Sequence, residues 1–213
     1  MPAAVTDNRG RAYWERHAKR YDTSTRFRAR PVPRLLELAV GAARGKARVL
    51  EVAAGTGLVT TAIAPVVGEL IATDYAGEMV KRLEARVCDA GLTNVTCQQA
   101  DIYNLRFDSS SFDAVFAANV LHLVPDLERA LASLRRVLKP GGVLVAPTYL
   151  HAETVRASVL SRVFALTGFP GHRRFSAGTL RSAVTSAGLS VTGFELISGP
   201  FPVGYLEAAL QQP

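Results

Sequence analysis

The residues with the clearest chemical pattern lie in the stretch VLEVAAGTGL, residues 49–58. A short apolar run containing the acid Glu51 leads into a turn of small residues, and such a turn lets a ligand approach the backbone closely. The next apolar run, ELIAT, is followed by Asp74, whose carboxylate could accept hydrogen bonds from both hydroxyls of a ribose. These features indicate a nucleoside-containing cofactor and fit a nicotinamide dinucleotide as well as other nucleosides.

The elements that must position these residues alternate between strands and helices. Apolar runs typical of buried strands occur at 47–53, 69–73, 94–99, 112–118 and 142–149. Helical patterns lie between them at 57–66, 76–90 and 127–138. This alternation predicts an α/β fold in which a parallel sheet is covered by helices on both faces.

The end of the chain follows a different pattern. A helical segment at 176–187 precedes two apolar runs, 189–198 and 201–210, which are joined by a short turn at Gly199 and Pro200. Because this connection is too short for a crossover helix, the two runs must be antiparallel.

The positive charge is concentrated at the start of the chain. The protein has 213 residues and a net charge of +7, and residues 1–46 hold 11 Lys and Arg against 4 Asp and Glu, so 11 − 4 accounts for all of it. Helices are expected there at 11–22 and 33–43. We predict a single domain over 1–213, and its parts are a basic N-terminal helical lid (1–45), a cofactor-binding core (46–149), a substrate-side insertion (150–175) and a C-terminal helix with an antiparallel strand pair (176–213).

Other classes of protein are not indicated. No apolar run approaches the ~18–20 residues of a membrane span, and the first residues lack the apolar core of a signal peptide, so we expect a cytoplasmic protein. Cys88 and Cys97 are expected to be reduced thiols, and no metal site is predicted. We expect a monomer or a homodimer.

Further motifs follow in order along the chain. Asp101 lies in QQADIYNL, the stretch FDAVFAANVLHLVPD covers the fourth apolar run, and LKPGG occupies 138–142. With these motifs, the chain over about 47–150 resembles the class I S-adenosylmethionine-dependent methyltransferases, in their ubiquinone/menaquinone-type (methyltransferase type 11) group. The resemblance implies a Rossmann-like seven-stranded sheet of order 3-2-1-4-5-7-6 whose last pair is antiparallel. It also implies the cofactor S-adenosyl-L-methionine, which leaves as S-adenosyl-L-homocysteine.

The resemblance further implies a set of cofactor-binding residues. Glu51 would order the turn, and Ala53, Ala54, Gly55 and Gly57 would contact the methionine portion. The ribose, the adenine and the remaining contacts would fall to Asp74, Tyr75, Met79, Asp101, Ile102, Asn119 and Tyr21. Ala53 stands where many members have a glycine, which is tolerable if its φ is negative.

No catalytic residue is assigned, because methyl transfer requires mainly alignment and desolvation. His122, Tyr149 and His151 are candidates for a general base, and His122 could equally be a structural histidine. We predict methylation of a small-molecule acceptor at O, N or C.

Alternatives remain open. The basic N-terminal segment leaves room for a lipid or quinone acceptor reached by peripheral membrane contact. A nicotinamide-dependent oxidoreductase needs a third glycine where this chain has Thr60, and a non-catalytic cofactor-binding module is a further alternative. A nucleic-acid partner is not expected, because the Asn/Asp-Pro-Pro-Tyr motif is absent after the fourth apolar run.

Overall fold

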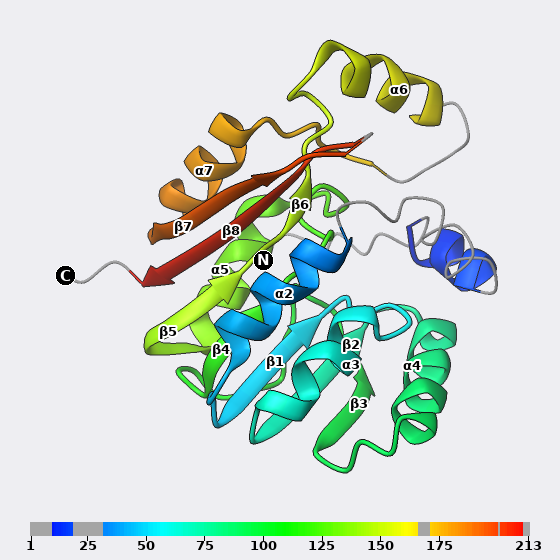
Figure 1. Cartoon of the computed structure of the whole chain (residues 1–213), viewed down its shortest axis with the longest axis vertical. Coiled ribbons are helices and arrows are strands. Elements are labelled where there is room, and N and C mark those ends of the chain that lie inside the picture. Colours follow the sequence, from blue (N-terminus) through cyan, green and yellow to red (C-terminus); the bar gives the residue numbers. More distant parts are fainter. Residues whose placement is uncertain (1–9, 19–31, 166–170, 200, 211–213) are drawn as a thin grey trace, which may run out of the picture.

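A twisted mixed sheet forms the centre of the molecule (Figure 1). The computed structural model describes residues 10–18, 32–165, 171–199 and 201–210. Within them, the strands are β1 (Arg48–Val52), β2 (Glu69–Asp74), β3 (Val95–Gln99), β4 (Phe112–Phe116), β5 (Leu138–Val145), β6 (Thr148–Tyr149), β7 (Leu189–Ile197) and β8 (Val203–Leu210). Their order is β3-β2-β1-β4-β5-β8, and both β6 and β7 pair with β8.

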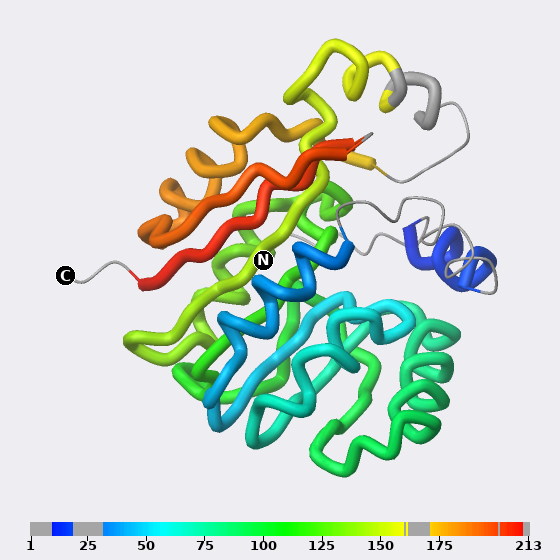
Figure 2. The backbone as a smooth tube through the Cα atoms, viewed as in Figure 1, coloured from blue at the N-terminus to red at the C-terminus, as the bar shows by residue number. Residues whose placement is uncertain are grey.

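The strand directions confirm the expected sheet. Strands β1 to β5 pair in parallel, whereas β8 runs antiparallel to its neighbours β5, β6 and β7. The predicted sixth and seventh strands are β7 and β8, so the order 3-2-1-4-5-7-6 is found. The backbone path in Figure 2 follows from it, because the chain runs outward from β1 to β3 and then returns past β1 to β4 and β5.

The fifth predicted strand differs from the expectation at both ends. It begins earlier, at Leu138, and it is divided into β5 and β6, which both pair with β8. Pro147 stands between the two strands and has no backbone N–H to donate, which accounts for the break in the ladder. The sheet therefore has eight strands rather than seven.

Helices cover both faces of the sheet, as the sequence pattern predicted. The helices are α2 (Val32–Ala43), α3 (Leu58–Ile63), the short 3₁₀ helix η1 (Ala64–Val66), α4 (Gly77–Asp89), α5 (Leu127–Val137), α6 (Val155–Ala165) and α7 (Ala177–Ser186), and residues 10–18 are also helical. In Figure 1, α2 and α3 lie in front of the sheet and α5 lies behind it.

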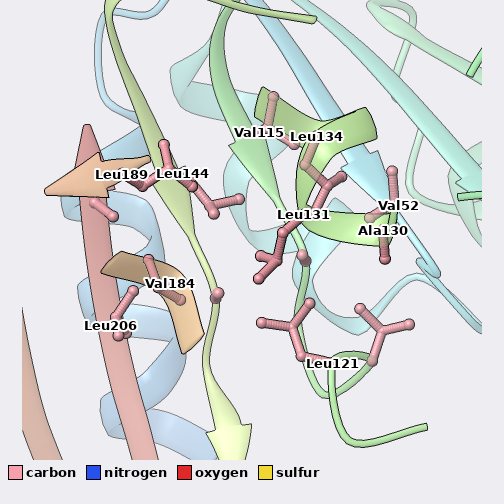
Figure 3. Packing of buried hydrophobic residues seen from close by; sticks show 14 of the residues in the cluster. Val52, Val115, Leu121, Ala130, Leu131, Leu134, Leu144, Val184, Leu189 and Leu206 are labelled. Carbon is pink, nitrogen blue, oxygen red and sulfur yellow. The ribbon is translucent and has the colours of Figure 1, made fainter. Parts of the chain in front are cut away.

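The two faces have separate cores, because alternate residues of each strand point to opposite sides. Leu35 of α2 and Ile63 of α3 pack with Val49 of β1 on one face. On the other face, Leu131 and Leu134 of α5 pack with buried residues of β4, β5 and β8, together with residues of α7 (Figure 3). These cores fix the strand ends that carry the site.

The remaining sequence predictions fall on both described and undescribed residues. The helix expected at 11–22 is described only over 10–18, and Tyr21 lies outside the described residues. The segment expected to be an insertion, 150–175, contains α6. The division of the chain into four functional parts stays a prediction. No helix in the described part of the chain is both long and apolar enough to cross a membrane.

Candidate active site

A cavity opens where β1, β2 and β4 end at their carboxyl termini, and this is where open α/β sheets bind ligands. Eleven of the residues singled out from the sequence line it: Ala53, Gly55, Asp74, Tyr75, Met79, Asp101, Ile102, Asn119, His122, Tyr149 and His151. Three others, Glu51, Ala54 and Gly57, are not part of this lining and belong to the strand and turn that support it. The structure thus brings the two ends of the predicted site, for cofactor and acceptor, into one cavity.

The small-residue turn is shaped by residues in the left-handed backbone region. The φ angles of Ala53, Gly55 and Gly57 are 52°, 58° and 88°. A side chain at Gly57 would also clash, since an added Cβ would lie 2.7 Å from Cδ1 of Leu83 on α4. We expected an alanine at position 53 to be tolerable if its φ were negative, but the φ of Ala53 is positive. This conformation costs a non-glycine residue about 1–2 kcal/mol.

This strain gives a testable prediction. Replacing Ala53 with glycine should leave the protein at least as stable as the wild type, with a gain of up to about 1 kcal/mol in the free energy of unfolding. Ala54 is the matched control: its φ is not positive and its methyl group is buried against Leu83 and Val87, so Ala54→Gly should lower stability by about 1 kcal/mol. Urea unfolding of the two variants measures both effects, and equal losses would contradict the strain at Ala53.

Asp74 at the end of β2 is held by backbone donors. Gly55 donates its N–H to Oδ2 at 2.8 Å, and Ala76 donates its N–H to Oδ1 at 2.9 Å. Burial raises the pKa of Asp74, and these backbone hydrogen bonds oppose that rise. The Tyr75 backbone also donates to this carboxylate, so of its four lone pairs at least one is left to accept a hydrogen bond from a ligand hydroxyl.

Glu51 lies under the turn and is only 1% exposed. Thr60 of α3 donates its hydroxyl to the carboxylate at 2.6 Å, and the hydroxyl of Thr73 donates to the Glu51 carbonyl at 3.1 Å. Burial raises the pKa of Glu51 to about 8, the Thr60 hydrogen bond opposes this rise, and the negative charge of Asp74 adds to it. Glu51 therefore ties β1 to α3 and β2 below the turn and supports the site without lining it.

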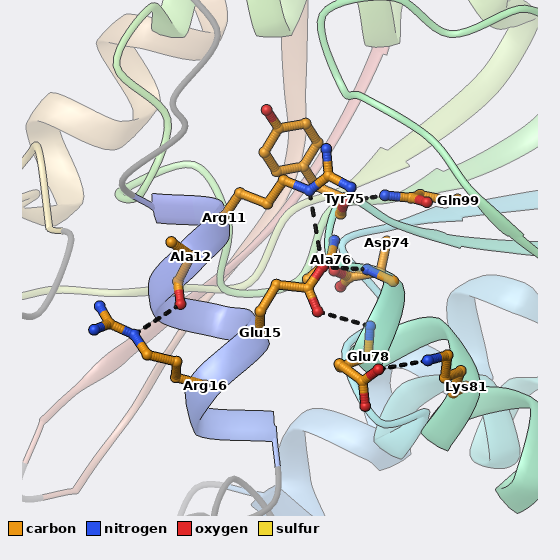
Figure 4. A network of polar contacts seen from close by, with 11 residues as sticks. Arg11, Ala12, Glu15, Arg16, Asp74, Tyr75, Ala76, Glu78, Lys81 and Gln99 are labelled. Atoms are coloured by element: carbon orange, nitrogen blue, oxygen red, sulfur yellow. Dashed lines mark hydrogen bonds and ion pairs between the residues drawn. The ribbon is translucent and has the colours of Figure 1, made fainter.

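The helix at residues 10–18 lies beside the cofactor end of the cavity and is hydrogen-bonded to the start of α4 (Figure 4). The Glu15 carboxylate accepts hydrogen bonds from the backbone N–H groups of Gly77 at 2.8 Å and Glu78 at 3.0 Å. These groups are the first donors of α4, whose own N-cap, Ala76, offers no side-chain cap. Glu15 thus supplies from a distant helix the cap that α4 lacks.

Arg11 and Trp14 extend the contact between this helix and the cavity. The Arg11 guanidinium lies 5.3 Å from the centroid of the Tyr75 ring and 3.8 Å from Glu15. Trp14 packs against the buried Met79, and all of these side chains except Glu15 line the cavity. The sequence predicted a helix here but gave no signal for Arg11 or Glu15, since neither belongs to a motif.

We expect Glu15→Gln to loosen this attachment. A glutamine can accept with one oxygen only and has no charge to offer the helix N-terminus, so the free energy of unfolding should fall by about 1 kcal/mol. The affinity for S-adenosylmethionine should fall about threefold to tenfold if the helix covers the bound cofactor. Glu84→Gln, on the exposed side of α4, is the control and should behave as the wild type. Thermal unfolding and calorimetric titration give the two readouts, and wild-type values for Glu15→Gln would refute the cap.

The opposite end of the cavity is lined by rings. The ring centroids of His122 and His151 are 5.3 Å apart, and that of His151 lies 5.2 Å from that of Phe201. The centroid of the Tyr149 ring lies 6.1 Å from that of either histidine. Burial, with a smaller contribution from His151, lowers the pKa of His122 to about 3. His122 is therefore neutral at physiological pH. Phe201 was missed from the sequence because a lone phenylalanine before a strand carries no functional signal.

A short segment of the predicted insertion is attached to this end. The N–H groups of His172 and Arg173 both donate to the His122 carbonyl, at 3.0 and 3.1 Å. The Arg173 guanidinium donates to the carbonyls of Val124 and Pro125. Arg173 thus holds the loop after β4 in place, and both Arg173 and its neighbour Arg174 line the cavity.

Asn119 lines the cavity from the loop that follows β4. Its φ is 53°, and its side-chain Oδ1 is buried with no hydrogen-bond partner in the described structure. An unpartnered buried acceptor costs free energy unless a ligand supplies a donor, and a cationic amino group is such a donor. Together with Asp74, this orphan acceptor fits a ligand that carries both a diol and an ammonium group, as S-adenosylmethionine does.

The comparisons with known proteins agree with this geometry. Residues 50–146 match the family described as a methyltransferase domain. The ubiquinone/menaquinone biosynthesis C-methyltransferase UbiE of Teredinibacter turnerae is 36% identical over 126 residues, which cover 57% of this chain and 49% of that protein. The chain spans about half the length of the curated ubiquinone/menaquinone methyltransferases that it matches.

Solved structures share the fold. A SAM-dependent methyltransferase from Aquifex aeolicus superposes with a TM-score of 0.73 at 22% identity, covering 92% of this chain and 98% of that one. The methyltransferase CalH, solved with S-adenosylhomocysteine, gives a TM-score of 0.65 at 19% identity, covering 84% of this chain and 55% of that one.

The matched region and the fold point to the same class: residues 50–146 match a methyltransferase domain, and the fold is similar to that of the solved methyltransferases. The curated relatives that match this region include ubiquinone/menaquinone biosynthesis C-methyltransferases.

Proposed function

We propose that this protein transfers a methyl group from S-adenosylmethionine to a small-molecule acceptor. The observation that carries the proposal is the single cavity with two unlike ends. One end presents the fixed carboxylate of Asp74 beside the turn of small residues, and the other is lined by the rings of His122, Tyr149, His151 and Phe201.

At the cofactor end, Asp74 would accept hydrogen bonds from the ribose hydroxyls. Ala53 and Gly55 would contact the methionine portion, and the Asn119 Oδ1 would accept from its ammonium group. Tyr75 and Met79 would contact the adenine, with Asp101 and Ile102 at its edge. These roles follow from the family resemblance and are supported by the position of each residue in the cavity lining.

The bound cofactor supplies a methyl group on a sulfonium, which passes to a nucleophile as the S–C bond breaks and S-adenosylhomocysteine leaves. The chain's part is to align the acceptor and keep water out, for which the buried His122 and Phe201 are suited. His122, with a pKa of about 3, is a weak base and is not proposed to remove an acceptor proton, whereas His151 and Tyr149 stay candidates.

Two measurements test the proposal in sequence. Calorimetric titration should show binding of both S-adenosylmethionine and S-adenosylhomocysteine, and an acceptor screen that detects released S-adenosylhomocysteine should then identify turnover. Binding of neither would refute the proposal. NADH added as a competitor should leave both titrations unchanged, because its pyrophosphate finds no third glycine in the turn.

A second acceptor class is supported by the curated relatives, whose names specify C-methylation in ubiquinone and menaquinone biosynthesis. A quinone-type acceptor would be reached at a membrane surface through the basic N-terminal segment. Sedimentation with anionic vesicles tests this: neutralising Arg26, Arg28, Arg30 and Arg34 together should release the protein into the supernatant. Unchanged sedimentation would remove the membrane version and leave the methyltransferase proposal intact.

A further inference from the structure

The acceptor end of the cavity, defined here by His122, Tyr149, His151, Arg173, Arg174 and Phe201, has two arginines and no acid among these described lining residues. The acidic residues that line the cavity are Asp74 and Asp101, which both lie at the cofactor end. Among the described residues, no carboxylate forms an ion pair with Arg173 or Arg174. Arg173, Asp101 and Asp126 all act on Tyr103, so acids lie near Arg173, and the positive charge left for a ligand at this end is that of Arg174.

The two arginines have different tasks. The Arg173 guanidinium donates from Nη1 to the Val124 carbonyl and from Nη2 to the Pro125 carbonyl, so these two donors hold the loop. Arg174 makes no such bond within the described residues and is exposed at the rim of the cavity. Its guanidinium keeps its planar set of donors for a ligand, and that set matches a carboxylate with two parallel hydrogen bonds.

The rings set the shape of the ligand. His122 and Phe201 are only 2% and 8% exposed, so protein covers most of both rings and they form the back of the wall. Tyr149 and His151 complete this wall and are half-buried. Flat aromatic ligands pack well against such rings in offset or edge-to-face arrangements. His122 is neutral because burial lowers its pKa to about 3, so it adds no competing positive charge to the wall.

We infer that the acceptor is a planar aromatic molecule that carries a carboxylate, with its ring against Tyr149 and His151 and its carboxylate on Arg174. This inference rests on the proposed methyltransferase function and names the substrate class of the same site. The segment that carries Arg174 is attached to the loop that carries His122, since the backbone N–H of Arg173 donates to the His122 carbonyl.

The test uses matched pairs of probes, each an aromatic carboxylate and its uncharged primary amide: 4-hydroxybenzoate, 3,4-dihydroxybenzoate and indole-3-acetate with the corresponding amides. Each is titrated calorimetrically into the full chain saturated with S-adenosylhomocysteine. At least one acid should bind at least tenfold more tightly than its amide. Arg174→Gln should remove that preference, because the affinity for the acid falls about tenfold while the affinity for the amide stays unchanged. Arg174→Lys should keep part of the preference.

Arg156→Gln is the matched control, because Arg156 is exposed on α6 and does not line the cavity. It should bind every probe as the wild type does. The inference is overturned if no acid binds, if acids and amides bind equally, or if Arg174→Gln keeps the preference. Binding of S-adenosylhomocysteine is recorded in the same samples, so its loss would report failure of the proposed function instead.

Discussion

Replacing Asp74 with asparagine is expected to weaken the binding of S-adenosylmethionine at least 100-fold. Asparagine has one acceptor oxygen, so its amide nitrogen would face either the N–H of Gly55 or that of Ala76, and one of these hydrogen bonds would be lost. A charged acceptor for the ribose hydroxyls disappears as well. Hydrogen bonds to charged groups contribute about 1.5–3 kcal/mol each, and 100-fold corresponds to about 2.8 kcal/mol.

The fold should survive this change. Burial already raises the pKa of Asp74 by penalising its charge, and the neutral asparagine avoids that penalty. Thermal unfolding should therefore shift little while calorimetric titration shows the loss of affinity. Asp89→Asn, at the exposed end of α4, is the control and should bind the cofactor normally. An Asp74→Asn variant with wild-type affinity would mean that the carboxylate does not contact the cofactor.

Replacing Glu51 with glutamine is expected to change how the free energy of unfolding depends on pH. The pKa of Glu51 rises from its ordinary value of 4.5 to about 8 on folding, so the folded state binds a proton more tightly than the unfolded state. The stabilisation from this proton is fully present below pH 4.5 and is lost as the pH rises to about 8. Glutamine keeps the acceptor for Thr60 but does not titrate.

The stability of Glu51→Gln relative to the wild type should therefore increase with pH. Over the whole window the difference in the free energy of unfolding should grow by about 5 kcal/mol, at ~1.4 kcal/mol for each pKa unit. Urea unfolding of both proteins at pH 5, 6, 7 and 8 measures it, with Glu84→Gln as an exposed control. His122 has the opposite dependence, since its lowered pKa makes stability fall below pH 6.5, but it is present in both proteins and cancels. A difference that stays constant with pH would show that Glu51 titrates normally.

The parallel core could be predicted because its signals are local. Each strand of the core is an apolar run bounded by a helix pattern, and the turn after β1 is visible as a cluster of small residues. The antiparallel end followed from one short connection at Gly199 and Pro200. Asp74 could be placed in the cavity because it directly follows a predicted strand, and the carboxyl ends of parallel strands meet at one edge.

Other features could not be predicted because they depend on contacts between distant segments. Glu15 caps a helix that begins 62 residues later, and nothing in its neighbourhood indicates this. The positive φ of Ala53 follows from the path between β1 and α3, whereas the residue type favours a negative angle. Arg173 is recognisable as basic, but its bonds to carbonyls 48 and 49 residues away exist only in the folded chain.

The two ends of the cavity also differ in where they lie along the chain. Apart from the helix at 10–18, the cofactor end is built from residues 52–119, within or beside the region that matches the methyltransferase domain. Most of the acceptor end comes from residues 149–201, beyond that region. Under the proposed function, exchanging this later segment between related chains is expected to change which molecule is methylated and to leave the donor site untouched. Substrate choice in such a fold can evolve, or be redesigned, independently of the methyl donor.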